Sequence, residues 1–449
     1  MTIEQFKNKI NGKQVTVVGI GVSNLPLIEF LLKCGANVTA CDKKDRQNIK
    51  ETAAELEAKG VTLKLGGDYL DDIKADVIFK SPGIRPDIPE FVAAQESGAT
   101  LTSEMELFFE LCPCDIIAVT GSDGKTTTTT LISEMLKKEG FTCHVGGNIG
   151  KPLVAEVENM SEKDMVVLEL SSFQLFTMKK SPKVAVITNI APNHLDWHID
   201  FDEYVDAKKN IMRYQNKEDV LVTNSANDIT KSIGLSAIGK SRTFSSKGEA
   251  DVHLREGIIY FGDEKIIDSC DIKIPGAHNV ENYMTAIAAV RDFVSNETIE
   301  YVAKNFGGVE HRIEFVREIG GIKFYNDSIA SSPTRAMAAL NSFDKKIILI
   351  AGGYDKKIPF DELGVKINEK VKELVLVGHT AQKIKAAVEN AGDQTNITVC
   401  DGFEEAVLCA YSKAKTGDIV ILSPACASFD LFENFMVRGR KFKEIVNNI

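Results

Sequence analysis

Residues 116–127 read IIAVTGSDGKTT, and this stretch decides the fold of the middle of the chain. The apolar run predicts a buried strand, the glycines open a loop, and the sequence that follows is compatible with a helix to about Lys138. A strand, a glycine-rich loop and a helix present unpaired backbone N–H groups to phosphate. The predicted contacts of a nucleoside triphosphate are Gly121, Ser122, Asp123, Gly124, Lys125, Thr126 and Thr127.

The loop is a variant of the strict phosphate-binding pattern, which has a glycine where Val119 stands. A plain helix-capping turn is therefore the alternative interpretation. The flanking strand and helix favour the phosphate site, with Lys125 supplying a charge and Thr126 a hydroxyl for Mg²⁺.

Short β-branched runs alternate with amphipathic helical stretches on both sides of this loop, which predicts an α/β fold with repeated parallel strands. The runs are Val15–Val18, Val38–Ala40, Val77–Phe79, Ile116–Val119, Met165–Leu168, Val184–Thr188, Ile347–Ile350, Leu374–Val377 and Ile419–Leu422. Three domains are expected, at residues 1–103, 104–308 and 309–449. Residues 244–275 are predicted to add hairpin strands to the middle domain.

Composition limits the classes of protein that this chain can belong to. It has 449 residues, 44% hydrophobic and 26% charged, as expected of a folded multidomain protein. It has neither an apolar signal core nor an apolar run of about 20 residues, so no membrane insertion is expected and the cytoplasm is the expected location. A net charge of −11 argues against nucleic acid as a partner, and nine scattered cysteines offer no disulfide framework.

Polar residues that suit a metal or phosphate site follow other predicted strands. Glu169 follows Met165–Leu168, where a carboxylate can reach a cation on the phosphate loop, although an exposed glutamate is the alternative. His194 lies among Asn and Asp in a strand exit, which suits either a ligand or a hydrogen-bonded loop residue. Lys208, beside Lys209 on the predicted helix Phe201–Tyr214, by itself indicates only a solvated helix face.

The N-terminal strand is followed by Gly19-Ile-Gly-Val-Ser-Asn24, and Asp42 ends the next strand about twenty residues later. This spacing partly matches a dinucleotide fingerprint, but Asn24 replaces its third glycine. An NAD-dependent oxidoreductase is therefore one alternative, and a nucleotide with another head group is a second. The turn Lys80–Gly83 adds another loop at the same sheet edge.

Taken in order, these motifs resemble the Mur ligase family over essentially all 449 residues. The resemblance rests on Thr120–Thr126, Gly146–Gly150, Glu169–Gln174, Asn193–Asp196, Tyr204 with Lys208, Pro275–Asn279 with Asn282, and His311-Arg312. The C-terminal Leu422–Asp430, with Asn434-Phe435 and Arg438-Gly439, resembles the family member that adds D-glutamate rather than its siblings.

The resemblance implies N- and C-terminal Rossmann-like domains flanking a central P-loop ATPase domain. It implies ATP-dependent joining of D-glutamate to UDP-N-acetylmuramoyl-L-alanine through an acyl phosphate, in peptidoglycan precursor synthesis, by a monomer. ATP and two Mg²⁺ ions are implied, with Lys208 carbamylated. A sibling ligase or a folylpolyglutamate synthase-like ligase that uses another amino acid is the nearest alternative, and a non-catalytic nucleotide switch is a more distant one.

The family's functional residues fall on defined positions of this sequence. Catalysis is implied for Lys125, His194 and Lys208, and metal binding for Thr126, Glu169, His194 and Lys208. ATP would also contact Asn282, Arg312 and Asp327. The UDP substrate would contact Gly21, Val22, Ser23, Asp42, Ser81, Pro82, Gly83, Asn148 and Ser171, and D-glutamate would contact Ser331, Lys356, Ser428 and Phe435.

One position departs from the family pattern. Ile329 stands in Asn326-Asp-Ser-Ile-Ala-Ser331 where the family often carries a lysine. An isoleucine cannot pair with phosphate or carboxylate. Either the site tolerates one fewer contact, or Lys356, Lys357 or Arg335 compensates.

Overall fold

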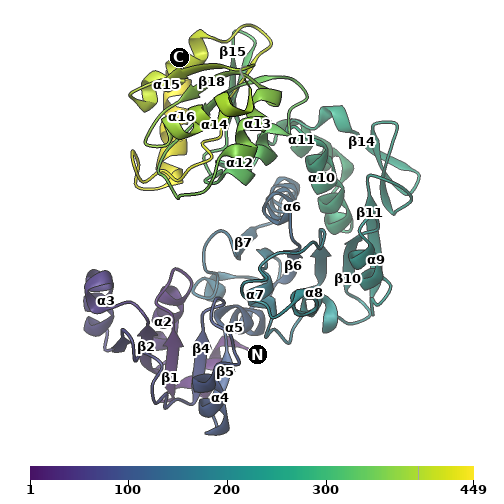
Figure 1. Cartoon of the computed structure of the whole chain (residues 1–449). Helices are drawn as coiled ribbons and strands as arrows, with labels where there is room; N and C mark the ends of the chain where they lie inside the picture. The colour runs from purple at the N-terminus through teal and green to yellow at the C-terminus, as the bar shows by residue number, and fades with distance from the viewer. Residues whose placement is uncertain (393) are drawn as a thin grey trace. The chain divides into compact units, whose positions relative to one another are not determined.

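The computed structural model describes residues 1–392 and 394–449, which form two compact units (Figure 1). The first unit comprises residues 1–267 and 281–300, and the second comprises residues 268–280 and 301–449. Among the residues described, we find no helix with the length and apolar character needed to cross a membrane.

The first sheet of unit one is entirely parallel, in the order β3-β2-β1-β4-β5. Its strands are β1 Gln14–Val18, β2 Asn37–Asp42, β3 Thr62–Leu65, β4 Val77–Lys80 and β5 Thr100–Thr102, with helices α1 Ile3–Ile10, α2 Asn24–Lys33, α3 Lys50–Ala58 and α4 Pro89–Glu96. The strand order reverses between β1 and β4. In such sheets ligands bind outside the carboxyl ends of the strands at this switch point.

The second sheet has nine strands, in the order β14-β13-β12-β11-β10-β9-β6-β8-β7. The strands are β6 Asp115–Thr120, β7 Cys143–Gly147, β8 Met165–Glu169, β9 Val184–Ile187, β10 Val220–Asn224, β11 Lys240–Ser245, β12 Val252–Arg255, β13 Ile258–Phe261 and β14 Glu264–Asp268. The helices are α5 Glu104–Leu111, α6 Lys125–Glu139, α7 Ser172–Leu175, α8 Phe201–Arg213, α9 Asp228–Gly234, α10 Ala277–Val290 and α11 Asn296–Asn305. The order places β6 between β8 and β9, so three strand ends meet at the predicted phosphate loop.

One continuous apolar core joins the two sheets of unit one. Phe30 and Phe79 from the first sheet region, Phe108 of α5, and Ile116 and Leu168 from the second sheet belong to the same buried cluster. Phe108 is fully buried on a helix that directly follows β5. This shared burial explains why residues 1–267 pack as one compact unit, since apolar contact is the main favourable term in folding.

Unit two contains a six-stranded sheet, in the order β15-β16-β20-β17-β18-β19, with only β15 antiparallel to its neighbour. The strands are β15 Glu314–Ile319, β16 Ile322–Asn326, β17 Ile347–Ala351, β18 Val371–Leu376, β19 Asn396–Val399 and β20 Ile419–Leu422. The helices are α12 Pro333–Leu340, α13 Asp361–Lys370, α14 Ala381–Ala391, α15 Phe403–Ser412 and α16 Phe435–Asn448. Alternate residues of β17 pack into cores on opposite faces of the sheet, with Leu349 facing α12–α14 and Ile350 facing α15 and α16.

The predicted α/β class is confirmed, and every predicted apolar run coincides with a strand or overlaps one. The predicted helix Phe201–Tyr214 corresponds to α8 (Phe201–Arg213), and β12 and β13 form an antiparallel hairpin within residues 244–275. Each of the three sheets lies inside one predicted domain. The boundaries at 103/104 and 308/309 stay predictions.

Leu349 tests the importance of the central strand of unit two. Its side chain is fully buried, so Leu349→Ala should lower the free energy of unfolding by about 3–5 kcal/mol because it leaves a cavity. Leu408 on α15 is 44% exposed, and Leu408→Ala should cost less than about 0.5 kcal/mol. Urea unfolding of the two variants measures the difference, and equal costs would contradict the assigned packing.

Candidate functional site

The phosphate loop leaves β6 through two glycines that have left-handed backbones. Gly121 has φ +145° and Gly124 has φ +78°. A Cβ atom on Gly121 would lie 1.9 Å from Thr188 Oγ1, and one on Gly124 would lie 2.5 Å from Asn282 Oδ1. Gly124 also caps α6 without a side-chain hydrogen bond. The loop therefore lies close to its neighbours and offers the positive end of α6 to an anion.

A carboxylate lies directly beside this helix start. Glu169, at the end of β8, is 2% exposed and accepts a hydrogen bond from Thr126 Oγ1 at 2.7 Å. Its other oxygen accepts from Asn148 Nδ2 at 2.8 Å. The structure thus brings together three residues that sequence reasoning selected separately.

Two lysines surround the same loop from different elements. Lys125 Nζ donates to the carbonyl oxygens of Gly121 and Ser122, both at 3.0 Å. Lys208 of α8 is 2% exposed, and its Nζ donates to Gly121 O at 2.9 Å and Thr120 Oγ1 at 3.2 Å. Burial, together with the charge of Lys125, holds the pKa of Lys208 well below its ordinary value. The solvated helix face that two adjacent lysines by themselves indicate is therefore excluded for Lys208, while its implied metal-binding role stays a prediction.

His194 lies in the loop after β9, with φ +55°. Its ring makes an edge contact with Phe173 at a centroid distance of 4.9 Å. Partial burial lowers the pKa of His194, the carboxylate of Asp196 opposes this shift, and Lys125 and Lys208 add to it. A neutral imidazole is the form that ligates metals.

Several residues that fix the loop carried no site role in the sequence analysis. Asn189 Oδ1 accepts from the backbone N–H groups of Ser122 and Asp123 at 3.2 and 2.9 Å. Tyr204, 1% exposed, has its hydroxyl 2.9 Å from Ser122 Oγ. The position of Tyr204 one helical turn before Lys208 was the available signal, since residues four apart share a helix face.

A cavity of about 360 Å³ opens beside Glu169 in unit one. Six of the residues predicted to bind the UDP substrate line this cavity, namely Val22, Ser23, Pro82, Gly83, Asn148 and Ser171. Gly147, Ile149, Gly150, Pro152, Phe173 and Gln174 also line it, although no site role was assigned to them. The cavity joins loops from both sheets of the unit.

The remaining predicted UDP contacts, Gly21, Asp42 and Ser81, do not line this cavity. Asp42 accepts from the backbone N–H groups of Ile20 and Lys44 at 2.7 and 2.9 Å. Ser81 Oγ accepts from Asn24 Nδ2 at 3.1 Å. Asp42 and Ser81 therefore hold the loop after β1 in place, and Asn24 contributes a side chain that the third glycine of a dinucleotide fingerprint lacks.

In unit two, Asp327 follows β16 and is 4% exposed. Burial raises the pKa of Asp327 to about 7, although the hydrogen bonds from Ser423 and from the N–H of Ile313 act to lower this pKa. Ser423 Oγ donates to Asp327 Oδ2 at 2.7 Å. The positive charge of Arg312 also acts on this carboxyl group, so two predicted ATP contacts are near each other.

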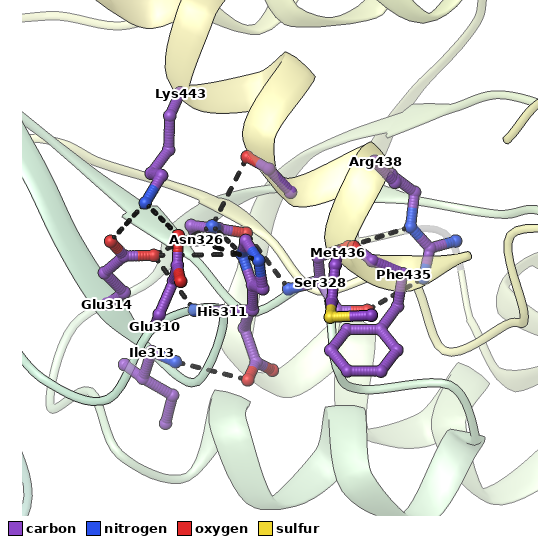
Figure 2. Close-up of polar contacts among 12 residues, drawn as sticks. Glu310, His311, Ile313, Glu314, Asn326, Ser328, Phe435, Met436, Arg438 and Lys443 are labelled. Atoms are coloured by element: carbon purple, nitrogen blue, oxygen red, sulfur yellow. Dashed lines mark hydrogen bonds and ion pairs between the residues drawn. The ribbon is translucent and has the colours of Figure 1, made fainter. Parts of the chain in front are cut away.

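Figure 2 shows the polar network around His311 and Arg438. Asn326 Nδ2 donates to His311 Nδ1 at 2.9 Å and to Glu314 at 3.0 Å. Arg438, 3% exposed, donates to Ser328 Oγ at 3.0 Å and to the carbonyl oxygens of Ser328, Cys426 and Ala427. Arg438 had no predicted site role, yet its hydrogen bonds hold the segment that leads to Ser428.

Two of the predicted D-glutamate contacts meet in this unit, since Lys356 Nζ lies 3.5 Å from Ser331 Oγ. Ser428 is 2% exposed, and Phe435 begins α16 with its ring at a centroid distance of 5.9 Å from His311. Arg335 Nη1 lies 3.5 Å from the backbone oxygen of Ile329. Arg335 therefore lies beside Ile329, where the family's lysine is absent, and Lys356 lies beside Ser331, two residues further along the chain.

The donors around Glu169 fit a magnesium ion. Mg²⁺ is usually bound through one or two carboxylates, with substrate phosphates and water completing its shell. Thr126 and Glu169 supply a hydroxyl and a carboxylate at hydrogen-bond distance. Within residues 1–392 and 394–449, no three His, Cys, Asp or Glu side chains gather into a metal cluster.

The fold and this loop define a P-loop-type nucleotide-binding α/β protein with a carboxylate at the phosphate site. Comparison with known families makes the assignment more specific. Residues 13–103 match the Mur ligase MurD-like N-terminal domain, residues 119–290 the Mur ligase middle domain, and residues 311–426 the Mur ligase glutamate ligase domain. The chain belongs to the Mur ligase family.

Relatives that match the full chain bear one name. A protein of Acetivibrio thermocellus named UDP-N-acetylmuramoylalanine--D-glutamate ligase is 55% identical, covering 100% of this chain and 99% of its own. A Clostridium botulinum protein of the same name is 53% identical, covering 99% of both chains. The structure also resembles UDP-N-acetylmuramate-alanine ligase MurC of Thermotoga maritima, with a TM-score of 0.58, 19% identity, and coverage of 97% of this chain and 99% of that one. MurF of Acinetobacter baumannii has a TM-score of 0.58 at 17% identity, covering 99% and 93%. These two structures support the fold alone.

Asp327 should make the stability of unit two depend on pH. Its folded pKa of about 7 lies above the ordinary value of 3.8, so its contribution is fully present below about pH 4 and is lost as the pH rises to about 7. Asp327→Asn should remove this slope, which cannot exceed about 1.4 kcal/mol per pH unit for one proton. Hydrogen exchange of amides in β16 and β20 between pH 4 and 8, corrected for intrinsic rates, measures it. An unchanged slope in the variant would contradict the assignment.

Proposed function

We propose that this chain joins D-glutamate to UDP-N-acetylmuramoyl-L-alanine at the expense of ATP, as a step of peptidoglycan precursor synthesis. The observation that carries the proposal is the Thr126–Glu169–Asn148 group, which links the phosphate loop to the cavity beside it. The choice of D-glutamate among the family's amino acids is supported by the name of the relatives at 53–55% identity. The proposed enzyme acts as a monomer in the cytoplasm.

The proposed reaction has two steps, both involving the carboxylate of the acceptor nucleotide. The acceptor carboxylate attacks the γ-phosphorus of ATP, ADP leaves, and an acyl phosphate forms. The neutral amine of D-glutamate then attacks the acyl carbon, and the tetrahedral intermediate loses phosphate and one proton from the attacking nitrogen, which leaves an amide N–H. Both steps develop negative charge on oxygen, which Lys125 and the positive end of α6 would stabilise.

Magnesium would be held by Thr126 and Glu169 in a first site, and by His194 with modified Lys208 in a second. Bound there, the ions would neutralise charge on the transferring phosphoryl group. Asn148 orients the carboxylate of Glu169 by donating to the oxygen that Thr126 does not use. Asn282 would contact the base of ATP, and Arg312 and Asp327 its phosphate and ribose.

We propose further that Lys208 carries a carbamate. A carbamate forms when a neutral amine attacks carbon dioxide and releases a proton. The lowered pKa of the buried Lys208 favours the neutral amine. The product is a carboxylate-like group, which removes the repulsion that an ammonium would exert on Mg²⁺.

D-glutamate would be bound in unit two by Ser331, Lys356, Ser428 and Phe435. The ammonium of Lys356 would pair with one carboxylate of the amino acid, and its position near Ser331 Oγ places a hydroxyl donor beside that charge. Lys356 and Arg335 are the cations that would offset the absence of a charge at Ile329.

A substrate panel tests the function directly. With Mg²⁺, ATP and UDP-N-acetylmuramoyl-L-alanine, the protein should release phosphate on addition of D-glutamate but not L-alanine, L-lysine or L-glutamate. Omitting the acceptor nucleotide should abolish the release, and a coupled phosphate assay with chromatography of the nucleotide product measures both. Equal or faster release with another amino acid would favour a sibling ligase instead.

Lys208→Ala should lower kcat by about 100-fold or more, because it removes the carbamate that would hold the second Mg²⁺, and with that ion a source of stabilisation for the negative charge of the transition state. Formate or acetate should partly restore activity by occupying the position of the carbamate. Carbon-13 NMR in the presence of labelled carbon dioxide should give a carbamate signal in the wild-type protein but not in the variant. Lys208→Arg is the matched control, since it keeps the charge and cannot form the carbamate at neutral pH. Full activity of Lys208→Arg would exclude the modification.

A further inference from the structure

Arg85 lies two residues after Gly83, which lines the cavity, and all five of its N–H donors are used. Its guanidinium forms parallel bonds to the carboxylate of Asp87 at 2.9 and 2.8 Å. A second pair of bonds reaches Glu203 on α8, both at 3.0 Å, and Nη1 also donates to Trp197 O at 3.0 Å. A side chain from the first sheet region is thereby fixed to two points of the second.

Aromatic rings complete the surroundings of this guanidinium. Its central carbon lies 5.1 Å from the centroid of Trp197 and 5.4 Å from that of Phe176. Trp197 Nε1 in turn donates to Gly83 O at 2.9 Å. The loop at 82–85 and the loop at 193–198 are therefore joined in both directions, once through Arg85 and once through Trp197.

Glu203 links Arg85 to His198, which lies next to the second wall of the cavity. It accepts from the backbone N–H of Ile199 at 2.9 Å and lies 3.2 Å from His198 Nδ1. The hydrogen bonds from Arg85 keep the pKa of Glu203 at about 2, so it remains an acceptor and His198 Nδ1 carries the proton. His198 Nε2 then accepts from Ser172 Oγ at 3.0 Å.

Ser172 stands between two residues that line the cavity, Ser171 and Phe173. The ring of Phe173 contacts His194 in the loop after β9. A chain of contacts therefore runs from the loop that contains Gly83 on one wall, through Arg85, Glu203 and His198, to Phe173 on the other wall, whose ring stacks on that of His198 at a centroid distance of 5.8 Å. None of the three connecting side chains lines the cavity itself.

We propose that Arg85 is a positioning residue, which sets the separation of the two cavity walls for the acceptor nucleotide and, through Phe173, the placement of His194. The inference rests on the proposed function of the cavity. Arg85 touches no reacting group, so its effect reaches the substrate through Trp197, Glu203 and His198. Displacements of about 1 Å at such supports can cost about 100-fold in rate.

An ordinary ion pair is the simpler explanation of these contacts, and exposed pairs contribute only about 0–1 kcal/mol. The Arg85 and Glu203 side chains are 21% and 20% exposed, so the pair is mostly shielded from water. If Arg85 only stabilised the structure, its removal would lower the melting temperature without changing how the remaining folded protein binds its substrate. Ligand affinity therefore distinguishes the two explanations.

The test compares Arg85→Met with Arg242→Met. Arg242, on β11 of the same unit, also binds a carboxylate, with Nη2 donating to both oxygens of Asp292 at 3.0 Å. It donates to a backbone oxygen (Ala288, 2.7 Å) and lies over an aromatic ring (Phe261, 5.7 Å) as well. It lies outside the residues that line the cavity. The two substitutions thus remove the same kinds of contact, to a carboxylate, a backbone oxygen and an aromatic ring, and only the first lies on the chain of contacts to both cavity walls.

Calorimetry with UDP-N-acetylmuramoyl-L-alanine and steady-state kinetics should separate the variants. Arg85→Met should raise the Kd and KM of the acceptor nucleotide about tenfold and lower kcat by about tenfold or more, with KM for ATP within about threefold of wild type. Arg242→Met should leave these constants within about twofold, whatever its melting temperature. Arg85→Lys should be intermediate, since an ammonium lacks the planar fork.

Adding Glu203→Gln to Arg85→Met should cost little more than Arg85→Met alone, because residues on one chain of contacts are not additive. Acceptor affinity and kcat within twofold of wild type in a folded Arg85→Met protein would overturn the proposal, as would equal losses in Arg242→Met. Failure of the proposed function is a separate result, since it would already appear as an absence of D-glutamate-dependent phosphate release in the wild-type protein.

Discussion

The arrangement of the site depends on how closely the backbone at Gly121 approaches the neighbouring strand β9. With no side chain and φ +145°, Gly121 lets the chain turn sharply out of β6, at a place where a Cβ atom would lie 1.9 Å from Thr188 Oγ1. Its carbonyl oxygen then accepts from both Lys125 and Lys208. The start of α6, the carboxylate of Glu169 and two amines are thereby gathered around one turn of backbone.

Lys208 and Glu169, beside this turn, do not neutralise each other by a direct ion pair among the residues described. Burial instead disfavours the charged form of Lys208. Lys208 is enclosed by neutral acceptors, and its pKa falls because burial and Lys125 disfavour a second ammonium. Glu169, in contrast, is held by a hydroxyl and an amide, which leave its charge available to a cation. Such a site favours ligands that bring both anionic oxygens and divalent cations, as nucleotides with magnesium do.

The strands and the phosphate loop could be predicted from sequence because both follow local rules: apolar runs for the strands, and glycines with a lysine for the loop. The environment of Lys208 could not, since two adjacent lysines on a helix give no sign that one of them is buried under another strand's loop. Arg85, Glu203 and His198 were missed for a similar reason. Their contacts span up to 118 positions in sequence, and each residue type alone is common on protein surfaces.

The choice between lysine and arginine at these positions follows from what each group must do. A buried lysine loses its charge readily, so the lowered pKa of Lys208 suits the neutral amine that the proposed carbamate requires. Arginine keeps its charge and its planar fork, which suits Arg85 and Arg438, whose donors each reach several acceptors at fixed angles. Arg438 makes these bonds to a hydroxyl and to backbone carbonyls, so it orders a loop. The structure thus uses lysine where chemistry is proposed and arginine where loops are held in place.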